Sequence, residues 1–88
     1  MGSGTLVVIE SWTEEERLVQ WSGPYHEPLL QQLQELVQGY VEAVDITYKG
    51  KVCTAWVNEE ARLRNMPLNV QASIVCGFRV YGPLVINI

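Results

Sequence analysis

The sequence is poor in the residues that bind metals and carry out acid–base chemistry. It holds one histidine, one aspartate and two cysteines among 88 residues. A zinc site needs clustered His, Cys or carboxylate ligands, and Cys53 and Cys76 lie far apart without such a cluster. Nucleophilic catalysis needs a hydroxyl or thiol beside a base, and we interpret the single His26 as a helix-entry or surface residue. We therefore expect no enzyme activity, no catalytic residue, no metal site and no cofactor.

Positive charge is also scarce. Six Lys and Arg residues stand against ten Asp and Glu residues, which gives a formal net charge of −4. General binding to nucleic acid requires a basic surface, so this class of partner is disfavoured. The seven glycines are dispersed and form neither the dinucleotide-binding fingerprint nor a P-loop.

Long apolar runs are absent as well. No stretch approaches the roughly 18 residues that a membrane-spanning helix requires, and no signal peptide is recognisable. These features predict a cytoplasmic protein without membrane contact. The two cysteines are then expected to be free, buried thiols, with a disulfide between them as the alternative.

The residues that are present suffice for one folded domain. Apolar residues make up 48% of the 88-residue chain, a share typical of globular proteins. We assign residues 5–88 to a single α+β domain and interpret residues 1–4 as a leader left from cloning. A domain of this size buries only about 60% of its unfolded surface, which favours a homo-oligomer as a source of further burial.

One amphipathic helix is predicted from Pro28 to Val37. Proline is common at the first helical position because its missing N–H is not needed there. Apolar residues recur at spacings of three and four, and glutamines take the opposite face. Gly39 is expected to end the helix in the left-handed conformation that other residues adopt only at a cost.

Two β-hairpins are predicted on either side of this helix. Thr5–Trp12 and Arg17–Trp21 are rich in β-branched and apolar residues and are expected to pair with each other. Tyr40–Tyr48 and Lys51–Val57 are predicted to pair through a Lys-Gly turn.

The register of the second hairpin follows from the turn length. A two-residue loop places Ile46 opposite Cys53 and Val44 opposite Ala55, which gathers apolar side chains on one face. Trp56 then lies on the other face. It is expected either to be covered by a second layer or to be presented to a partner.

The last third of the chain gives weaker signals. Asn58–Asn69 is predicted to be a surface loop with one helical turn over Glu59–Leu63. Val70–Cys76 is either a short helix or the approach to the last strand, and Phe78–Ile88 is predicted to be a strand interrupted near Gly82–Pro83. The predicted fold class is α+β: a small antiparallel or mixed sheet of four to five strands packed on one main helix, in the order β-β-α-β-β-(short α)-β.

Polar and aromatic side chains outside the helix are the candidates for ligand binding. Guanidinium groups bind anions, and aromatic rings stack on bases. The alternative for the aromatic residues is burial in the core or in a subunit interface, and the alternative for the loop residues is simple solvent exposure. The candidate ligand-binding residues are Asn58, Arg62, Arg64 and Asn69 in the polar loop, with Trp21, Tyr25 and Trp56 as stacking surfaces.

Three segments carry a pattern found in a known family. They are Leu33–Val44 (LQELVQGYVEAV), Val57–Asn69 (VNEEARLRNMPLN) and Phe78–Ile86 (FRVYGPLVI). Together they resemble a family of small phage and plasmid proteins known as domain of unknown function 3846. In that family a Leu-rich helix runs through Gly-Tyr into a hairpin, and an Asn-Glu-Glu loop follows. Ala61 stands where the family usually has glycine.

The resemblance implies an accessory protein of a phage or other mobile element in a bacterial cytoplasm. Small proteins of this kind often act by binding. We therefore expect a non-enzymatic counter-defence factor that sequesters a nucleotide-derived immune signal at the junction of a homo-oligomer. The alternatives are a protein–protein inhibitor of a host defence or regulatory protein without a small-molecule pocket, a small enzyme, and a structural accessory domain.

Overall fold

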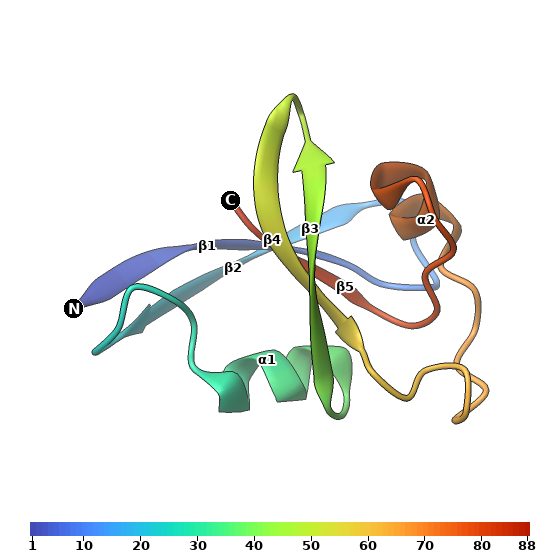
Figure 1. Cartoon of the computed structure of the whole chain (residues 1–88), viewed down its shortest axis with the longest axis horizontal. Helices are drawn as coiled ribbons and strands as arrows, with labels where there is room; N and C mark the ends of the chain where they lie inside the picture. The colour runs from blue at the N-terminus through green and yellow to red at the C-terminus, as the bar shows by residue number, and fades with distance from the viewer.

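A five-stranded antiparallel sheet dominates the fold. The computed structural model describes all 88 residues and shows the strands in the spatial order β2-β1-β5-β4-β3 (Figure 1). Two short helices accompany the sheet, so the fold is of the α+β type. The elements are β1 (Gly2–Ile9), β2 (Glu16–Gly23), α1 (Leu30–Val37), β3 (Val41–Tyr48), β4 (Lys51–Asn58), α2 (Val70–Cys76) and β5 (Leu84–Asn87).

Strand β5 joins two long hairpins. β1 pairs with β2 and β3 pairs with β4 over eight residues each, as the sequence predicted for these pairs. β5 is paired with four residues of β1 on one side and three residues of β4 on the other. In Figure 1 the β1–β2 hairpin runs across the view while the β3–β4 hairpin stands upright, so the sheet is strongly twisted. Residues 2–4, which we interpreted as a leader, extend β1 against residues 21–23 of β2.

Apolar side chains pack on both faces of the sheet. Successive residues of a strand point to opposite faces, and β1 shows this alternation in its buried half. Leu6 and Val8 face the α1 side, whereas Val7 and Ile9 face the α2 side. The prediction of a sheet packed on one main helix is not confirmed. Two short helices, α1 and α2, lie on opposite faces instead.

Helix α1 begins two residues later than predicted. Leu29 is the N-cap and has extended backbone angles, so Pro28 lies before the helix instead of in its first turn. The apolar stripe that the spacing predicted is present: Leu33 and Val37 are buried against the sheet. Leu30, the first residue of the helix, remains 57% exposed.

The helix also ends differently from the prediction. Gln38, and not Gly39, takes the left-handed position, with φ 67° and ψ 39°. Gly39 is required for a different reason. A Cβ atom on Gly39 would lie 2.7 Å from Arg64 Nη1 and 2.8 Å from Asn58 Nδ2. The glycine therefore makes room for two side chains that approach the end of α1.

The predicted register of the β3–β4 hairpin is confirmed. Ile46 lies opposite Cys53, and the other predicted pairs follow from it. Lys49 and Gly50 both have positive φ, at 50° and 80°, which is the backbone conformation of a two-residue hairpin turn. Trp56 packs on the opposite face from Ile46 and Cys53, as expected.

The segment after β4 forms the predicted loop and then a helix. The Arg64 N–H donates to the Glu60 carbonyl at 2.9 Å, which closes one helical turn within the loop. Of the two alternatives for residues 70–76, the helix is realised. Asn69 caps its N-terminus and Gly77, with φ 78°, takes the left-handed position at its C-terminus.

The first and last strands differ in length from the predictions. β1 ends at Ile9 and not at Trp12, because residues 10–15 make the turn into β2. β5 is confined to four residues after Gly82–Pro83, whereas a strand over Phe78–Ile88 with an interruption near Gly82–Pro83 was predicted. Residues 78–81 instead run back beside α2, where the Val80 carbonyl accepts from the Asn69 N–H at 2.8 Å.

A buried tyrosine connects the two hairpins. The Tyr48 hydroxyl, at the tip of β3, lies 2.7 Å from both carboxylate oxygens of Glu16 at the start of β2. Burial raises the pKa of Tyr48 to about 12, and the hydrogen bond to Glu16 and its negative charge act in the same direction.

Both cysteines are free thiols, so the disulfide alternative is not realised. Cys53 is buried, and burial raises the pKa of the partly buried Cys76 thiol to about 11. No helix of the structure is long and apolar enough to cross a membrane.

Candidate functional site

Asn58, a predicted ligand contact, is a buried structural residue. Its side chain is 4% exposed. Its Nδ2 donates to the Val37 and Gln38 carbonyls at 3.0 and 3.3 Å, and its Oδ1 accepts from the Glu60 N–H at 2.8 Å. The amide thus satisfies carbonyls at the end of α1 that have no partner within the helix. It has no free hydrogen left for a ligand.

Asn69 is occupied in the same way. It is 1% exposed, and its Nδ2 donates to the Ile9 and Gly82 carbonyls at 2.9 Å each. Its Oδ1 accepts from the Ala72 N–H at 3.0 Å, which is the N-cap contact of α2. One amide therefore fixes β1, α2 and the approach to β5 to one another.

The two predicted tryptophan stacking surfaces are core residues. Trp21 and Trp56 are 6% and 7% exposed and belong to the apolar cluster beneath α1. The Trp21 indole N–H is buried without a hydrogen-bond partner. The burial alternative that the sequence left open therefore applies to both rings.

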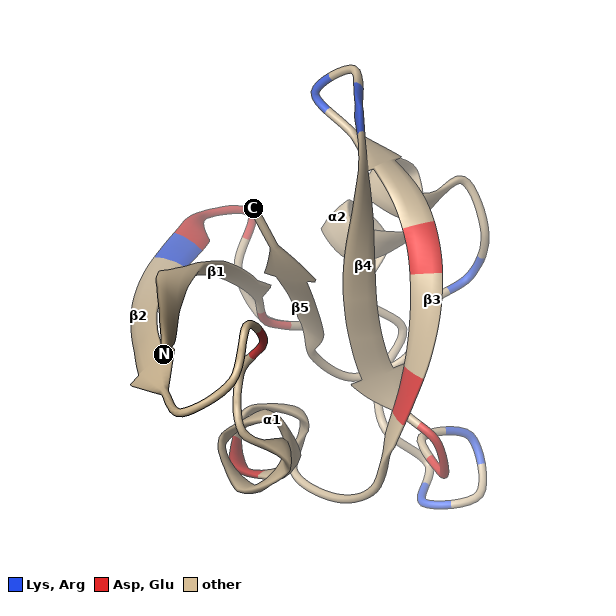
Figure 2. Cartoon of the chain, turned by 60° about the vertical axis from the view of Figure 1, so that its left-hand side comes forward, with Lys and Arg blue, Asp and Glu red and all other residues tan.

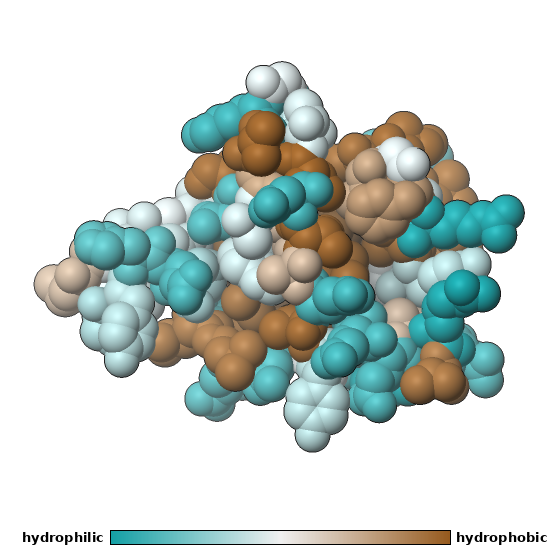
Figure 3. Space-filling view, in the orientation of Figure 1, coloured by the Kyte–Doolittle hydropathy of each residue, from teal (hydrophilic) through white to brown (hydrophobic).

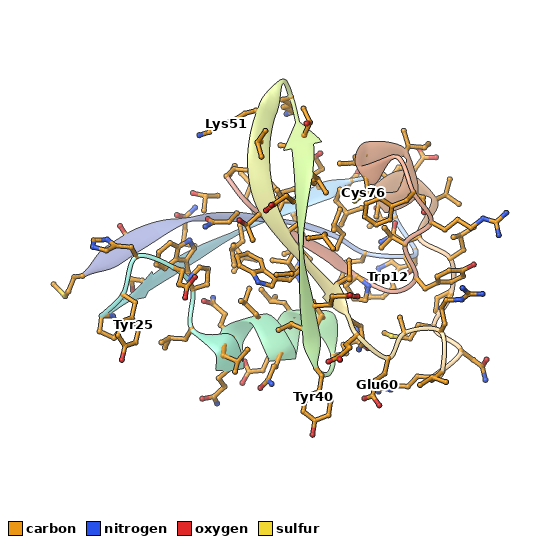
Figure 4. The ribbon with its side chains drawn as sticks, viewed as in Figure 1. Trp12, Tyr25, Tyr40, Lys51, Glu60 and Cys76 are labelled. Carbon is orange, nitrogen blue, oxygen red and sulfur yellow. The ribbon has the colours of Figure 1, made fainter.

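Tyr25 and Arg64 lie at the surface and away from each other. Tyr25 is 64% exposed on the connection between β2 and α1, where Figure 4 shows it at the edge of the molecule. The Arg64 guanidinium donates to the Gln38 carbonyl at the end of α1. This contact makes Arg64 a second cap of α1, beside Asn58.

Two of the predicted residues, Arg62 and the buried Asn58, line a groove that also contains the Phe78 and Tyr81 rings. The groove has a volume of about 230 Å³ and lies between the end of the β3–β4 hairpin, the loop after β4 and the segment after α2. We call it the Arg62–Tyr81 groove. Its lining residues are Glu42, Val44, Val57, Asn58, Glu59, Ala61, Arg62, Leu63, Phe78, Arg79, Val80 and Tyr81.

The groove combines rings, cations and carboxylates. The Arg62 guanidinium carbon lies 5.4 Å from the centre of the Tyr81 ring, in cation–π geometry. Phe78 is 46% exposed beside it. Arg62 and Arg79 can donate several hydrogen bonds to an anion, and the carboxylates of the lining can accept hydrogen bonds from hydroxyl groups.

Sequence reasoning missed three of these lining residues. Phe78, Arg79 and Tyr81 were assigned to the first part of the predicted strand, before its interruption near Gly82–Pro83, and alternate side chains of a strand point to opposite faces. The signal was the run Phe-Arg-Val-Tyr directly after Gly77, because two rings and a cation follow a glycine that can end a helix. No group of three or more His, Cys, Asp or Glu residues gathers anywhere in the structure.

One protein family matches nearly the whole length of the fold. The model of the family described as "Domain of unknown function (DUF3846)" matches residues 5–86, from β1 into β5. The chain belongs to the DUF3846 family. Neither the curated proteins nor the solved structures contain a match. The groove and the surface of this DUF3846 domain are therefore the guides to its function.

Proposed function

We propose that the protein is a non-enzymatic binding protein that holds a small nucleotide-type ligand in the Arg62–Tyr81 groove. The observation that carries the proposal is the guanidinium of Arg62 placed against the Tyr81 ring, with Phe78 and Arg79 on the same groove. A ligand that is both aromatic and anionic matches this combination. Base–aromatic stacking contributes about 1–3 kcal/mol per base in known complexes.

The carboxylates of the groove narrow the class of ligand. Glu42 and Glu59 line the Arg62–Tyr81 groove together with Arg62 and Arg79. Carboxylates accept hydrogen bonds from ribose hydroxyls in nucleotide-binding proteins, and they repel free inorganic anions. A ribose-containing nucleotide, such as an ADP-ribose-type or cyclic nucleotide, therefore suits the groove better than phosphate alone.

The size of the groove limits how much of the ligand is enclosed. Its volume of about 230 Å³ lies below the range of about 300–1,000 Å³ that is usual for drug-sized ligands. A single nucleoside monophosphate unit suits this space, and the remainder of a larger ligand would lie outside the groove on one protomer.

We extend the proposal to the biological setting that the sequence suggested: a counter-defence factor of a phage or plasmid that sequesters a nucleotide-derived immune signal in the bacterial cytoplasm. The two arginines of the lining can hold an anionic signal, and holding the signal is sufficient for sequestration. A protein that only binds can act by lowering the free concentration of a signal.

Isothermal titration calorimetry with a panel of cyclic and ADP-ribose-type nucleotides tests the proposal. Arg62→Ala and Arg79→Ala are each expected to weaken binding by about tenfold or more, since a hydrogen bond to a charged group contributes about 1.5–3 kcal/mol. Lys51→Ala, an exposed cation on the hairpin tip, is the matched control and should bind like the wild type. Arg64→Ala should also retain binding, because Arg64 caps α1 instead of lining the groove.

The titrations also discriminate the alternatives. Binding that survives both Arg62→Ala and Arg79→Ala would place the ligand elsewhere. No binding of any nucleotide would favour the protein–protein inhibitor, and conversion of a nucleotide to product would favour a small enzyme.

A further inference from the structure

An apolar ridge runs along the outer side of α2. Val70 and Ile74, one helical turn apart, are 61% and 71% exposed. Trp12 in the β1–β2 turn is 73% exposed and lines a hollow of about 290 Å³ together with them. Phe78, two residues beyond the end of α2, is 46% exposed. We call these four residues the α2 ridge.

Several exposed side chains of α2 and its neighbours form the ridge. Ala72 is buried and Val75 and Cys76 pack against the core, whereas Val70 and Ile74 of the same helix face solvent. Figure 3 shows apolar surface over α2. Large exposed apolar side chains that gather on one face of a soluble domain mark a candidate interaction surface.

Opposite charges flank the ridge on its two sides. On one side Glu14 lines the same hollow as Trp12. On the other side Arg79 belongs to the segment that runs back beside α2, which is held by the Val80 N–H donating to Ser73 Oγ at 2.8 Å. Figure 2 shows acidic positions in the β1–β2 turn and basic positions in the loops on the β3 side.

We infer that the α2 ridge pairs two copies of this chain about a two-fold axis. In a two-fold interface the same patch faces itself, so each side of the patch meets the opposite side of its counterpart. The acidic side of one ridge then lies against the basic side of the other, while the apolar residues pack at the centre. A patch with one sign of charge on both sides would repel a second copy, whereas this one is self-complementary.

The interface would have the composition that stable interfaces share. Trp12 and Phe78 are aromatic residues of the kind enriched at interface centres, and charged residues lie at the rim. Phe78 and Arg79 also line the Arg62–Tyr81 groove, so a second copy seated on the ridge lies next to that groove. The inference concerns association of the unliganded chain and does not depend on the proposed ligand.

Analytical ultracentrifugation over a series of protein concentrations tests the inference without any ligand. The wild type should reach about twice the 10.0 kDa mass of the chain. Ile74→Asp should remain a monomer at the same concentrations. Val52→Asp is the matched control, because Val52 on the β3–β4 hairpin is also 71% exposed but lies outside the ridge, and this variant should still form dimers.

Charge reversal tests the two-fold arrangement itself. Glu14→Lys and Arg79→Glu should each raise the dimer dissociation constant by about tenfold, because each places like charges opposite each other. The double variant should return to within about threefold of the wild type, because the two sides are exchanged together. Circular dichroism confirms that each variant is folded.

Three results would overturn the inference. They are a wild type that stays monomeric at all concentrations, an Ile74→Asp variant that dimerises like the wild type, and a double charge variant no tighter than the single ones. A wild type that stays monomeric alone but forms a complex with another protein through Ile74 would assign the ridge to that partner.

Discussion

At the scale of single residues, two asparagines show how a polar side chain in a loop can be mistaken for a ligand contact. Asn58 and Asn69 are both nearly inaccessible, and each makes three hydrogen bonds to the backbone. Their sequence neighbourhood is polar, which predicts exposure. The backbone ends of α1 and α2 need these amides, and that need is visible only when the elements are placed in space.

Tyr48 provides a pH-dependent contribution to stability at the residue scale. Its pKa of about 12 in the folded chain exceeds its ordinary value of 10.0. The neutral hydroxyl is therefore favoured by folding, and its stabilising contribution is complete below pH 10 and is lost as the pH rises toward 12. We expect the unfolding free energy of the wild type to fall over this range, and that of Tyr48→Phe to fall less.

Urea denaturation at a series of alkaline pH values measures this difference. A parallel titration of tyrosinate absorbance should show one fewer late-ionising tyrosine in Tyr48→Phe. Tyr40→Phe serves as the control, because Tyr40 is 63% exposed and its hydroxyl donates no hydrogen bond to another residue. Identical pH profiles for the wild type and Tyr48→Phe would contradict the assignment.

At the scale of elements, α1 ends at a residue that is poorly suited to the position. Gln38 has φ 67°, a conformation that costs a residue with a side chain about 1–2 kcal/mol. Gln38→Gly should therefore raise the unfolding free energy by about 0.5–1 kcal/mol, after the greater flexibility of glycine in the unfolded chain is subtracted. Gln34→Gly, in the helix interior, should lower it by about 1 kcal/mol.

The midpoint of urea denaturation reports both changes. The two variants make the same substitution four residues apart, so opposite signs would follow only from their positions. A Gln38→Gly variant that is less stable than the wild type would show that the Gln38 side chain contributes more than the structure indicates.

The elements that the sequence predicted well are those whose signal is local. The hairpin register follows from the spacing of Ile46 and Cys53 around a two-residue turn, and the stripe of α1 follows from its leucines. The end of α1 was misassigned because Gly39 serves a close approach by Asn58 and Arg64, residues that are distant in sequence. The predicted strand over residues 78–88 was too long because Asn69 binds the Val80 backbone.

The candidate site was predicted only in part for the same reason. Arg62 was identified from its residue type, and it does line the groove. The partners of Arg62 were not identified. The cation–π contact between Arg62 and Tyr81 joins the loop after β4 to the segment after α2, and these segments are separate in the sequence. Local sequence patterns do not show which distant segments lie side by side.

At the scale of the whole molecule, one sheet separates two small cores. Leu33 packs on the α1 side and Ile86 on the α2 side, and they are 4% and 0% exposed. Leu33→Ala and Ile86→Ala should each lower the unfolding free energy by about 2–5 kcal/mol. Leu63→Ala, at an 84% exposed position, should change it by less than about 0.5 kcal/mol.

We also expect the cores on the two faces of the sheet to unfold in a single cooperative transition. Trp21 and Trp56 are buried on the α1 side, whereas Trp12 is already 73% exposed in the folded chain. The change in tryptophan fluorescence on unfolding therefore reports chiefly the α1 core, and far-UV circular dichroism reports the whole sheet. Both signals should change at the same urea concentration in every variant, because β5 is shared by the two cores. Two separate transitions in Ile86→Ala would show that the cores unfold independently.

The position of β5 in the chain has a consequence for how the protein forms during synthesis. Each hairpin closes between neighbouring segments, but β5 follows both of them in sequence and lies between them in the sheet. As the chain leaves the ribosome, the free edges of β1 and β4 therefore emerge before β5 can pair with them, and those edges can join other nascent chains. Only the arrival of residues 84–87 covers them, so slow translation of the segment before β5 should favour aggregation, and fast translation should favour the native sheet.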